Sequence, residues 1–167
     1  MILKVEVLAM EILYSKSQVG YWMSREPKTV SPDTSVRRAF FKMRYYNFRH
    51  LPVVKDGKLV GIVSDRDLRR PDVSEEPDGW DDFYRLDDSY EVCDVMATEL
   101  ITLRPRDTVR HALSIFLSHR FGALPVLNVQ GELVGILTAR DMFRAFDDLL
   151  AETGGWRRGE EVSGGGG

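Results

Sequence analysis

Several features that carry chemistry in proteins are scarce in this sequence. Cys93 is the only cysteine, so an internal disulfide and a thiolate-rich metal site are both excluded. The three histidines, His50, His111 and His119, come without a paired set of carboxylates, and they form no zinc signature. Neither a G-x-x-x-x-G-K-[ST] loop nor a G-x-G-x-x-G segment occurs. The sequence therefore predicts a protein that is not an enzyme.

A basic excess and a long apolar run are also lacking. The formal net charge is −3, whereas nucleic-acid-binding domains usually carry a basic excess. The stretch 37–50 mixes basic and aromatic residues, a pattern typical of single-stranded nucleic acid sites. Helical spacing, however, assigns Phe40 and Met43 to the core. We expect no nucleic acid partner, no signal peptide and no membrane span, and a cytoplasmic location.

What the chain does contain is an internal repeat. "FRHLPVV" at 48–54 matches "FGALPVL" at 121–127, and "GKLVGIVSDRDL" at 57–68 matches "GELVGILTARDM" at 131–142. The offset between the copies is 73 residues before the second of these motifs and 74 residues within it. The expected organisation is an N-terminal docking segment (1–18), a first repeat (19–70), an acidic linker (71–91), a second repeat (92–148) and a flexible Gly-rich tail (149–167).

Each copy predicts a β-α-β-β-α unit, so the expected fold class is α/β (α+β). Thr34 or Asp107 is the expected N-cap of the first helix. Two strands follow, joined at a Gly-containing turn, and a last helix begins at Ser64 or Thr138. Cys93 is expected to be a small buried residue. The predicted core faces of the first helices are Val36, Ala39, Phe40 and Met43, and Val109, Ala112, Leu113 and Phe116.

The segment between the copies is strongly acidic. Residues 71–90 contain eight Asp or Glu residues and one Arg. Such composition is typical of a solvated linker, although Trp80, Phe83 and Tyr84 favour some packing on a domain or a partner. The segment lies between the two copies, and its negative charges could respond to charged groups at the clefts. It is therefore also a candidate movable element.

The two copies together resemble a tandem pair of cystathionine β-synthase (CBS) domains, known as a Bateman module. The resemblance covers about residues 19–70 and 92–146, and the motifs that carry it are the two openings that begin at Met23 and Met96, the "LPVV" and "LPVL" strands, and the "GIVSxxDL" and "GILTxxDM" endings. It implies two repeats packed sheet to sheet about a pseudo-twofold axis. It also implies two clefts that bind AMP, ADP, ATP or S-adenosylmethionine, with no cofactor required.

The resemblance assigns ligand-binding roles to residues of both copies. Ser64 and Asp67, with Thr138 and Asp141, would contact the nucleotide, because carboxylates accept hydrogen bonds from ribose hydroxyls. Arg66 and Arg140 would offer donors to phosphate oxygens. His50 has no counterpart in the second copy and could touch a phosphate in one cleft only. By the same resemblance, the base pocket would be formed by backbone beside Val30 and Leu103, beside His50, Leu51 and Pro52, and beside Ala123 and Pro125.

Two alternatives stay open. Ser/Thr-x-x-Asp before a helix is also a capping box, which stabilises a fold without any ligand. The protein could therefore be a sensor that signals to an unknown regulated protein, or a constitutive dimerisation or interaction module with empty clefts. A homodimer through the first helix of each repeat is expected, on faces that include Phe41, Tyr45, Ile115 and Ser118.

Overall fold

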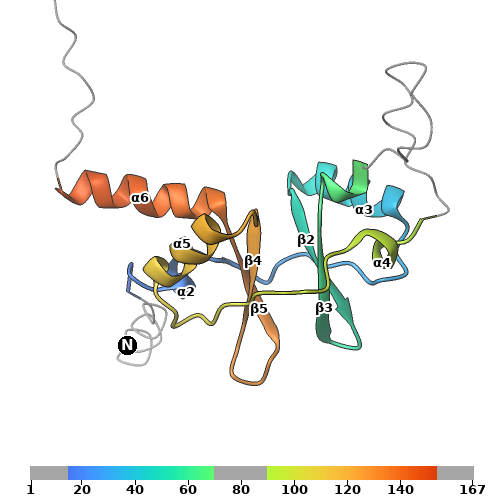
Figure 1. The fold of residues 1–167 in the computed structure, drawn as a ribbon, viewed down its shortest axis with the longest axis horizontal. Coiled ribbons are helices and arrows are strands. Elements are labelled where there is room, and N and C mark those ends of the chain that lie inside the picture. The colour runs from blue at the N-terminus through green and yellow to red at the C-terminus, as the bar shows by residue number, and fades with distance from the viewer. Residues whose placement is uncertain (1–14, 70–89, 154–167) are drawn as a thin grey trace, which may run out of the picture.

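The structure is a computed structural model that describes residues 15–69 and 90–153 (Figure 1). Most of the expected docking segment, nearly all of the acidic linker and most of the expected tail lie outside the described residues. Within the described residues, no helix is both long enough and apolar enough to cross a membrane.

Both halves contain the predicted first helix, two strands and last helical segment in order, whereas the predicted first strands, at Thr29–Val30 and Thr102–Leu103, are only single bridges at Val30 and Leu103. The first half holds α2 (Val19–Trp22), β1 (Ser24–Arg25), α3 (Val36–Tyr46), β2 (His50–Lys55), β3 (Lys58–Ser64) and the 3₁₀ helix η1 (Asp67–Arg69). The second half holds α4 (Val92–Val95), α5 (Val109–Ser118), β4 (Ala123–Leu127), β5 (Leu133–Thr138) and α6 (Ala139–Thr153). The predicted α+β fold of two similar repeats is thus confirmed.

The strands form two antiparallel hairpins that stand side by side (Figure 1). One hairpin pairs β2 with β3. The other pairs β4 with β5, and β1 pairs with the opposite edge of β5. Short parallel bridges add Val30 to Val53 and Leu103 to Val126. In each hairpin the register of the strand pairing shifts directly after the bridged residue, between Val53 and Val54 and between Val126 and Leu127.

The two repeats exchange their first segments. Val19 is fully buried in the second core, and its N–H donates to the carbonyl oxygen of Asp107 at 2.8 Å. Val92 is fully buried in the first core, and its N–H donates to the carbonyl oxygen of Thr34 at 2.9 Å. Each hydrophobic core is therefore completed by a segment that belongs, in sequence, to the other copy.

A methionine packed on a glycine repeats this exchange. A Cβ placed on Gly61 would lie 2.5 Å from the sulfur of Met96, and a Cβ on Gly135 would lie 2.5 Å from the sulfur of Met23. These distances leave no room for a side chain at either glycine. The methionine that opens one repeat therefore packs on the last strand of the other, which explains why both residue types recur.

The first helices begin one residue later than predicted. The N-caps are Ser35 and Thr108, whose hydroxyls accept from the backbone N–H three residues further on. The predicted caps, Thr34 and Asp107, instead accept from the N–H three residues earlier and close the preceding turn. A side chain that is already engaged in one turn leaves its neighbour to cap the helix.

Three predicted burial states are wrong. Ile115, expected on an exposed dimer face, is buried, and Leu113, expected in the core, is exposed. The inward face of α5 is set by Ala112 and Ile115, so that face is turned away from Leu113. Cys93 is exposed in the short helix α4, whose buried residue is Val92.

The described parts of the last helical segments differ in length. Only the 3₁₀ turn η1 follows β3 in the described residues, whereas α6 runs for 15 residues to Thr153, past the expected boundary at 148. Lys16 from the N-terminal segment holds the far end of α6, because its Nζ lies 2.7 Å from carboxylate oxygens of both Asp148 and Glu152. These two carboxylates raise the pKa of Lys16.

Candidate functional site

The end of β3 forms a compact polar turn, which we call the first tip (Ser64–Asp67). The backbone N–H of Ser64 donates to Oδ2 of Asp67 at 2.9 Å, and its hydroxyl donates to the same oxygen at 2.7 Å. In return, the N–H of Asp67 donates to the Ser64 hydroxyl oxygen at 3.3 Å. The turn is closed by bonds in both directions.

The end of β5 repeats this turn, and we call it the second tip (Thr138–Asp141). The N–H and hydroxyl of Thr138 donate to Oδ2 of Asp141 at 2.9 and 2.6 Å, and the N–H of Asp141 donates to the Thr138 hydroxyl oxygen at 3.3 Å. Asp141 is only 6% exposed, and its second oxygen, Oδ1, lies 3.8 Å from a guanidinium nitrogen of Arg144.

Both tips are therefore complete capping boxes, as the ligand-free interpretation predicted. The hydroxyl of the serine or threonine donates to the aspartate, and the aspartate also accepts from a backbone N–H, so the turn needs no further group to form these hydrogen bonds. In each aspartate, however, the two hydrogen bonds from the tip go to Oδ2 alone. A carboxylate has about four acceptor positions on two oxygens, so each aspartate keeps the capacity to accept bonds from a ligand.

The two tips lie at the same end of the two hairpins. His50 at the start of β2 is the register partner of Ser64, and Ala123 at the start of β4 is the partner of Thr138. The starts of β2 and β4 meet, because the imidazole of His50 occupies the space that a side chain on Gly122 would need. The fold thus brings together two tips that are 74 residues apart in the sequence.

The environment of His50 alters its acid–base chemistry. Burial lowers the pKa of the imidazole, the negative charges of Asp65 and Asp67 act to raise it, and Arg49 acts to lower it. The net direction is downward. The neutral ring is therefore the form that this position favours at the junction of the repeats.

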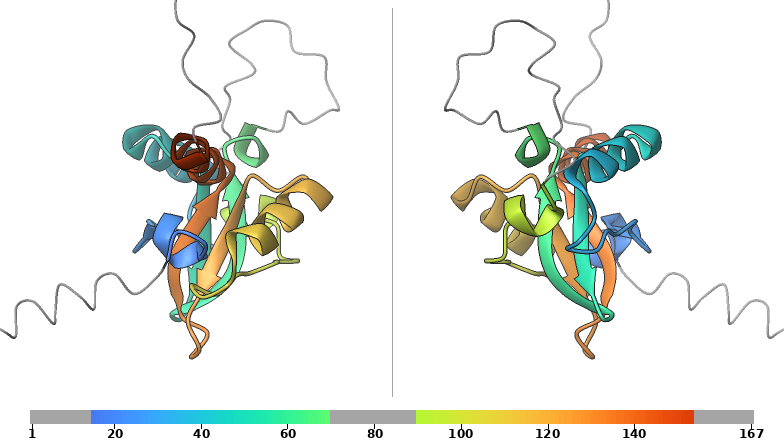
Figure 2. Two further views of the ribbon diagram at one scale, coloured as in Figure 1. Left: turned by 90° about the vertical axis from the view of Figure 1, so that its left-hand side faces the viewer. Right: turned by 90° about the vertical axis from the view of Figure 1, so that its right-hand side faces the viewer.

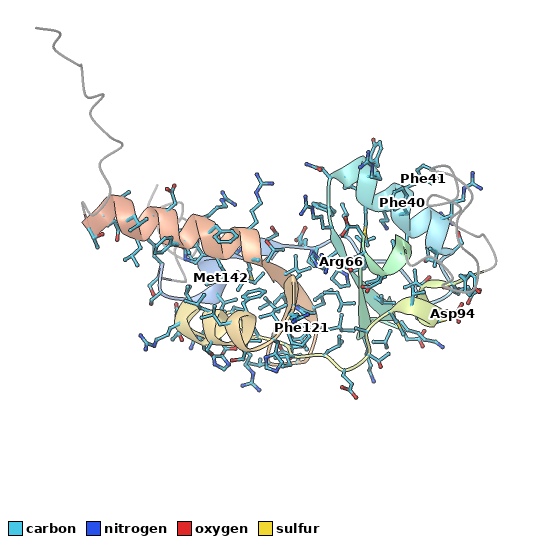
Figure 3. All side chains as sticks on the ribbon, turned by 45° about the horizontal axis from the view of Figure 1, so that its top comes forward. Phe40, Phe41, Arg66, Asp94, Phe121 and Met142 are labelled. Carbon is cyan, nitrogen blue, oxygen red and sulfur yellow. The ribbon has the colours of Figure 1, made fainter. Side chains whose placement is uncertain are left out.

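The two predicted arginines lie at the surface of the tips. Arg66 and Arg140 are both exposed, and Figure 3 shows Arg66 between the two halves of the molecule. Exposed guanidinium groups there can reach an anion without losing an internal partner that the fold needs. Among the described residues, the ion pairs of the structure include neither Arg66 nor Arg140.

The predicted base-pocket residues are mostly buried. The side chains of Val30, Leu51, Pro52, Leu103, Ala123 and Pro125 all lie in the interior. The backbone groups of Val30 bond to Pro52 and Val54 at 3.1 and 2.9 Å, and those of Leu103 bond to Pro125 and Leu127 at 2.9 and 2.8 Å. The N–H and C=O of Val30 and Leu103 are therefore engaged, and neighbouring residues would have to contact a base.

Beside Val30, the first repeat has a contact that the sequence analysis missed. The ammonium group of Lys42 on α3 donates to the carbonyl oxygen of Thr29 at 2.7 Å. The equivalent helix position in the second repeat is Ile115, an apolar residue that cannot donate. The replacement of a lysine by an isoleucine at equivalent positions of the two first helices was the signal that could have revealed this asymmetry.

A hollow of about 480 Å³ lies away from the tips. Its lining consists of Thr102, Leu103, Arg104 and Asp107, together with the hairpin residues Leu127, Asn128, Val129 and Gly131. Leu127 pairs with Leu133 at the turn end of the β4–β5 hairpin, opposite the end where Ala123 pairs with Thr138. The hollow shares Leu103 with the predicted base pocket, but it lacks the residues of either tip. Since the repeated chemistry is at the tips, we place the candidate site there.

Metal chemistry has no scaffold in the part of the chain that the structure describes. No three His, Cys, Asp or Glu side chains there are grouped closely enough to hold a metal ion. The candidate site is thus a duplicated hydroxyl–carboxylate turn with nearby arginines, an arrangement suited to binding a polar ligand.

Duplicated β-α-β-β-α units that exchange their first segments and present paired polar tips define a tandem-repeat module. The family model described as "CBS domain" matches residues 17–73 and 92–148. The chain belongs to the CBS domain family. It is 30% identical over 139 residues to the CBS domain-containing protein YhcV of Bacillus subtilis, a match that covers 83% of this chain and 91% of that protein.

A second group of relatives is larger. The inosine-5'-monophosphate dehydrogenase of Korarchaeum cryptofilum is 35% identical over 119 residues, which cover 71% of this chain and 22% of that enzyme. The chain thus spans less than a quarter of the length of this relative.

Solved structures agree with the fold. The CBS-pair protein CBSX2 from Arabidopsis thaliana superposes with a TM-score of 0.70 at 28% identity, covering 82% of this chain and 99% of that one. A structure of CBSX2 in complex with AMP has a TM-score of 0.65 at 30% identity, covering 79% of this chain and 97% of that one.

Proposed function

We propose that this protein is a non-catalytic regulatory module that binds an adenosyl nucleotide between its two repeats and signals its presence to a partner protein. AMP, ADP, ATP and S-adenosylmethionine are the candidate ligands. The observation that carries the proposal is the pair of matching tips, Ser64–Asp67 and Thr138–Asp141, at one end of the two hairpins. The AMP complex of the similar CBSX2 supports the same ligand class.

The chemistry of the tips suits the parts of a nucleotide. In this proposal, Asp67 and Asp141 accept hydrogen bonds from the two hydroxyls of a ribose, as acidic residues do in dinucleotide sites. Arg66 and Arg140 donate to phosphate oxygens in the charge-assisted manner that guanidinium groups favour. Ser64 and Thr138 hold each aspartate in place, so the capping box and the ligand site use the same residues.

Regulation requires that the ligand distinguish two arrangements of the module. A ligand shifts a conformational equilibrium only by its difference in affinity for the two states. His50 packed against Gly122 links the two repeats directly beside the tips, so a ligand there can favour one arrangement of the repeats. The regulated partner is a separate domain or protein, and a cytoplasmic location fits this role.

A thermal-melt titration with the four candidate ligands tests the proposal. At a hundredfold excess over the dissociation constant, a ligand adds about 2.7 kcal/mol to the stability, which raises the melting midpoint of a chain of this size by roughly 5–10 °C. The shift should become smaller in Asp67→Ala and in Asp141→Ala, and it should disappear when both substitutions are combined. It should persist in the control Glu99→Ala, which removes an exposed carboxylate elsewhere. The absence of any shift at millimolar ligand would overturn the proposal.

The second candidate is a constitutive interaction module with empty clefts. It is favoured by the completeness of both capping boxes without a ligand and by the engaged backbone of Val30 and Leu103. Under this alternative, the two aspartate variants lower the melting midpoint while no nucleotide changes it in any variant. The same titration therefore separates the two functions.

We further propose that the module self-associates as a homodimer. Phe41 and Tyr45 on α3 are exposed, as predicted, and so is Ser118 on α5, whereas Ile115 is buried and cannot belong to an interface. Exposed large apolar side chains gathered on helices mark interaction surfaces. Sedimentation analysis of the purified protein tests this part independently of ligand binding.

A further inference from the structure

A stacked pair of rings occurs at the same position in both repeats. In the first repeat, the rings of Tyr46 and Phe48 stack with their centroids 5.8 Å apart and their planes 13° apart. In the second, the rings of His119 and Phe121 stack with their centroids 5.1 Å apart and their planes 5° apart. The two pairs correspond to each other at the repeat offset of 73 residues. Each repeat therefore contains a stacked ring pair, which we call the first and the second ring pair, as well as a tip.

The ring pairs lie at the surface, and their neighbours fix their orientation. Phe48 is 43% exposed and Phe121 is 37% exposed. The ammonium group of Lys28 lies 5.6 Å from the ring centroid of Tyr46, and Nδ1 of His119 donates to a carbonyl oxygen one turn earlier at 3.2 Å. Exposed rings that are already held in place lose little freedom when a planar group stacks on them.

Each ring pair is next to a tip. The residues that follow the two phenylalanines bond directly to the tips, because the carbonyl oxygen of Arg49 accepts from the N–H of Asp65 at 2.9 Å, and that of Gly122 accepts from the N–H of Ala139 at 3.2 Å. In Figures 1 and 2, both hairpins turn at the lower end, so the starts of β2 and β4 lie at the upper end with the tips. Figure 3 shows Phe121 near the junction of the two halves.

The backbone donors beside the predicted base pocket are already used in both repeats. The N–H groups of Val30 and Leu103 donate to carbonyl oxygens of the neighbouring strands. Those of Ser31 and Arg104 donate to side-chain oxygens three residues further on. An acceptor atom on the edge of a base, such as N1 of adenine, finds no unengaged N–H at these four residues. A base in this region therefore has to be held by its face.

We propose that the two ring pairs are the base-stacking surfaces of the ligand sites, with Phe48 at the first tip and Phe121 at the second, and that the ligand class is purine nucleotides, guanine as well as adenine. Stacking tolerates different bases because every base has a π-face, and a purine offers a larger face than a pyrimidine. The tips contact the ribose and the phosphate. The inference rests on the nucleotide binding proposed above and adds how the base is held.

Substitution of each phenylalanine, with the other site removed, tests the inference by calorimetric titration. In an Asp141→Ala background, which keeps the first tip, Phe48→Leu should weaken AMP binding about tenfold, because leucine keeps an apolar contact and loses the π-face. In an Asp67→Ala background, Phe121→Leu should have the same effect at the second tip. Tyr21→Leu, which removes an aromatic residue that is 49% exposed and lies outside both ring pairs, is the control and should leave the affinity unchanged.

Two further titrations separate stacking from a structural role. Phe48→Trp and Phe121→Trp should bind AMP at least as tightly as the parent proteins, since an indole has a larger face, whereas a role in packing would not survive the larger ring. GMP should bind each site within about tenfold of AMP, because a stacking surface does not read the edge of the base. Circular dichroism verifies that every variant is folded.

Each outcome decides the inference. Weaker AMP binding in the leucine variants, together with retention in the tryptophan variants and binding of GMP, supports it. AMP affinity that is unchanged in both leucine variants, or lost equally in the tryptophan variants, overturns the stacking surface. GMP binding more than a hundredfold weaker than AMP binding would show that the base edge is read and would overturn it too. If AMP binding depends on Asp67 and Asp141 but not on the two phenylalanines, this inference alone fails, whereas no binding of either nucleotide overturns the proposed function with it.

Discussion

The first and second tips hold the same hydrogen bonds but sit in different surroundings. Beside Ser64 and Asp67 lie His50 and a short 3₁₀ turn, and the same repeat carries the lysine that donates to Thr29. Around Thr138 and Asp141 stand Ala123 and a 15-residue helix. The duplication thus preserves the local turn, because three hydrogen bonds within four residues define it. It allows the neighbouring residues to diverge, and the two candidate binding positions are not equivalent.

The divergence is itself correlated between the copies. His50 in the first copy is large, and Gly122, its neighbour across the junction, is the residue type that leaves room for it. In the repeat alignment, Arg49–His50 corresponds to Gly122–Ala123. The bulky His50 of one copy therefore faces the small Gly122 of the other, as close packing across a junction demands.

The largest expected effect comes from breaking the exchanged segments. Val19→Ala should lower the free energy of unfolding by about 2 kcal/mol, because Val19 is fully buried and its truncation leaves a cavity. Hydrogen exchange should show the greatest loss of protection in β4 and β5, the sheet of the other repeat. Val92→Ala is the matched variant and should loosen β2 and β3 instead. A loss of protection confined to the variant's own sequence repeat would contradict the exchange.

The two capping boxes should differ in their contribution to stability. Removal of a capping side chain costs about 0.5–2 kcal/mol, and Asp141 is buried at the start of a long helix, whereas Asp67 is half-buried before a short turn. Asp141→Ala should therefore destabilise the protein more than Asp67→Ala in urea unfolding. Equal costs would mean that the surroundings of the tips do not affect the capping box.

The Lys42 contact should affect only the first repeat. Lys42→Met removes the donor to the Thr29 carbonyl and should cost about 0.5–1.5 kcal/mol of stability. If a nucleotide base needs that carbonyl, the same variant should raise affinity at the first tip, a gain that Asp67→Ala abolishes and Asp141→Ala does not. Calorimetric titration measures both, and an affinity that falls in Lys42→Met would show that the lysine assists the ligand.

The smallest effect is a pH dependence from His50. Its pKa in the folded protein lies below the unfolded value of about 6.5, so the unfolded chain binds more protons between the two values. The stability should therefore rise with pH up to about 6.5, stay level above it, and be lost as pH falls through the folded pKa. His50→Gln should flatten this part of the profile. An unchanged slope in that variant would assign the dependence to other groups.

Much of the fold and the tips could be predicted from the sequence. The repeat fixes the order of elements, and the Ser/Thr-x-x-Asp spacing of Ser64–Asp67 and Thr138–Asp141 defines the capping box locally. The exchange of first segments could not be predicted, because Val19 and Val92 are equivalent residues and either core would accept either one. The packing of His50 on Gly122 depends on the junction between the repeats, which no local pattern specifies.

The rotation of a helix about its own axis is a second feature that could not be predicted from the sequence. The apolar residues Leu113 and Ile115 on α5 both fit an amphipathic pattern, and only tertiary packing decides that Ile115 faces inward. The exposure of Cys93 has the same origin, since the four-residue helix α4 buries Val92 and leaves the next residue outside.

Equilibrium binding of radiolabelled AMP to the purified protein tests the central claim most directly. The account predicts saturable binding of no more than two molecules per chain, reduced by Asp67→Ala or Asp141→Ala and lost when both are combined, with the folded state verified by circular dichroism. Binding that survives in the double variant would place the ligand elsewhere, for example in the hollow beside Arg104. The absence of binding by AMP, and of competition by the other three ligands against any labelled form, would contradict the account and leave the interaction module as the function of this chain.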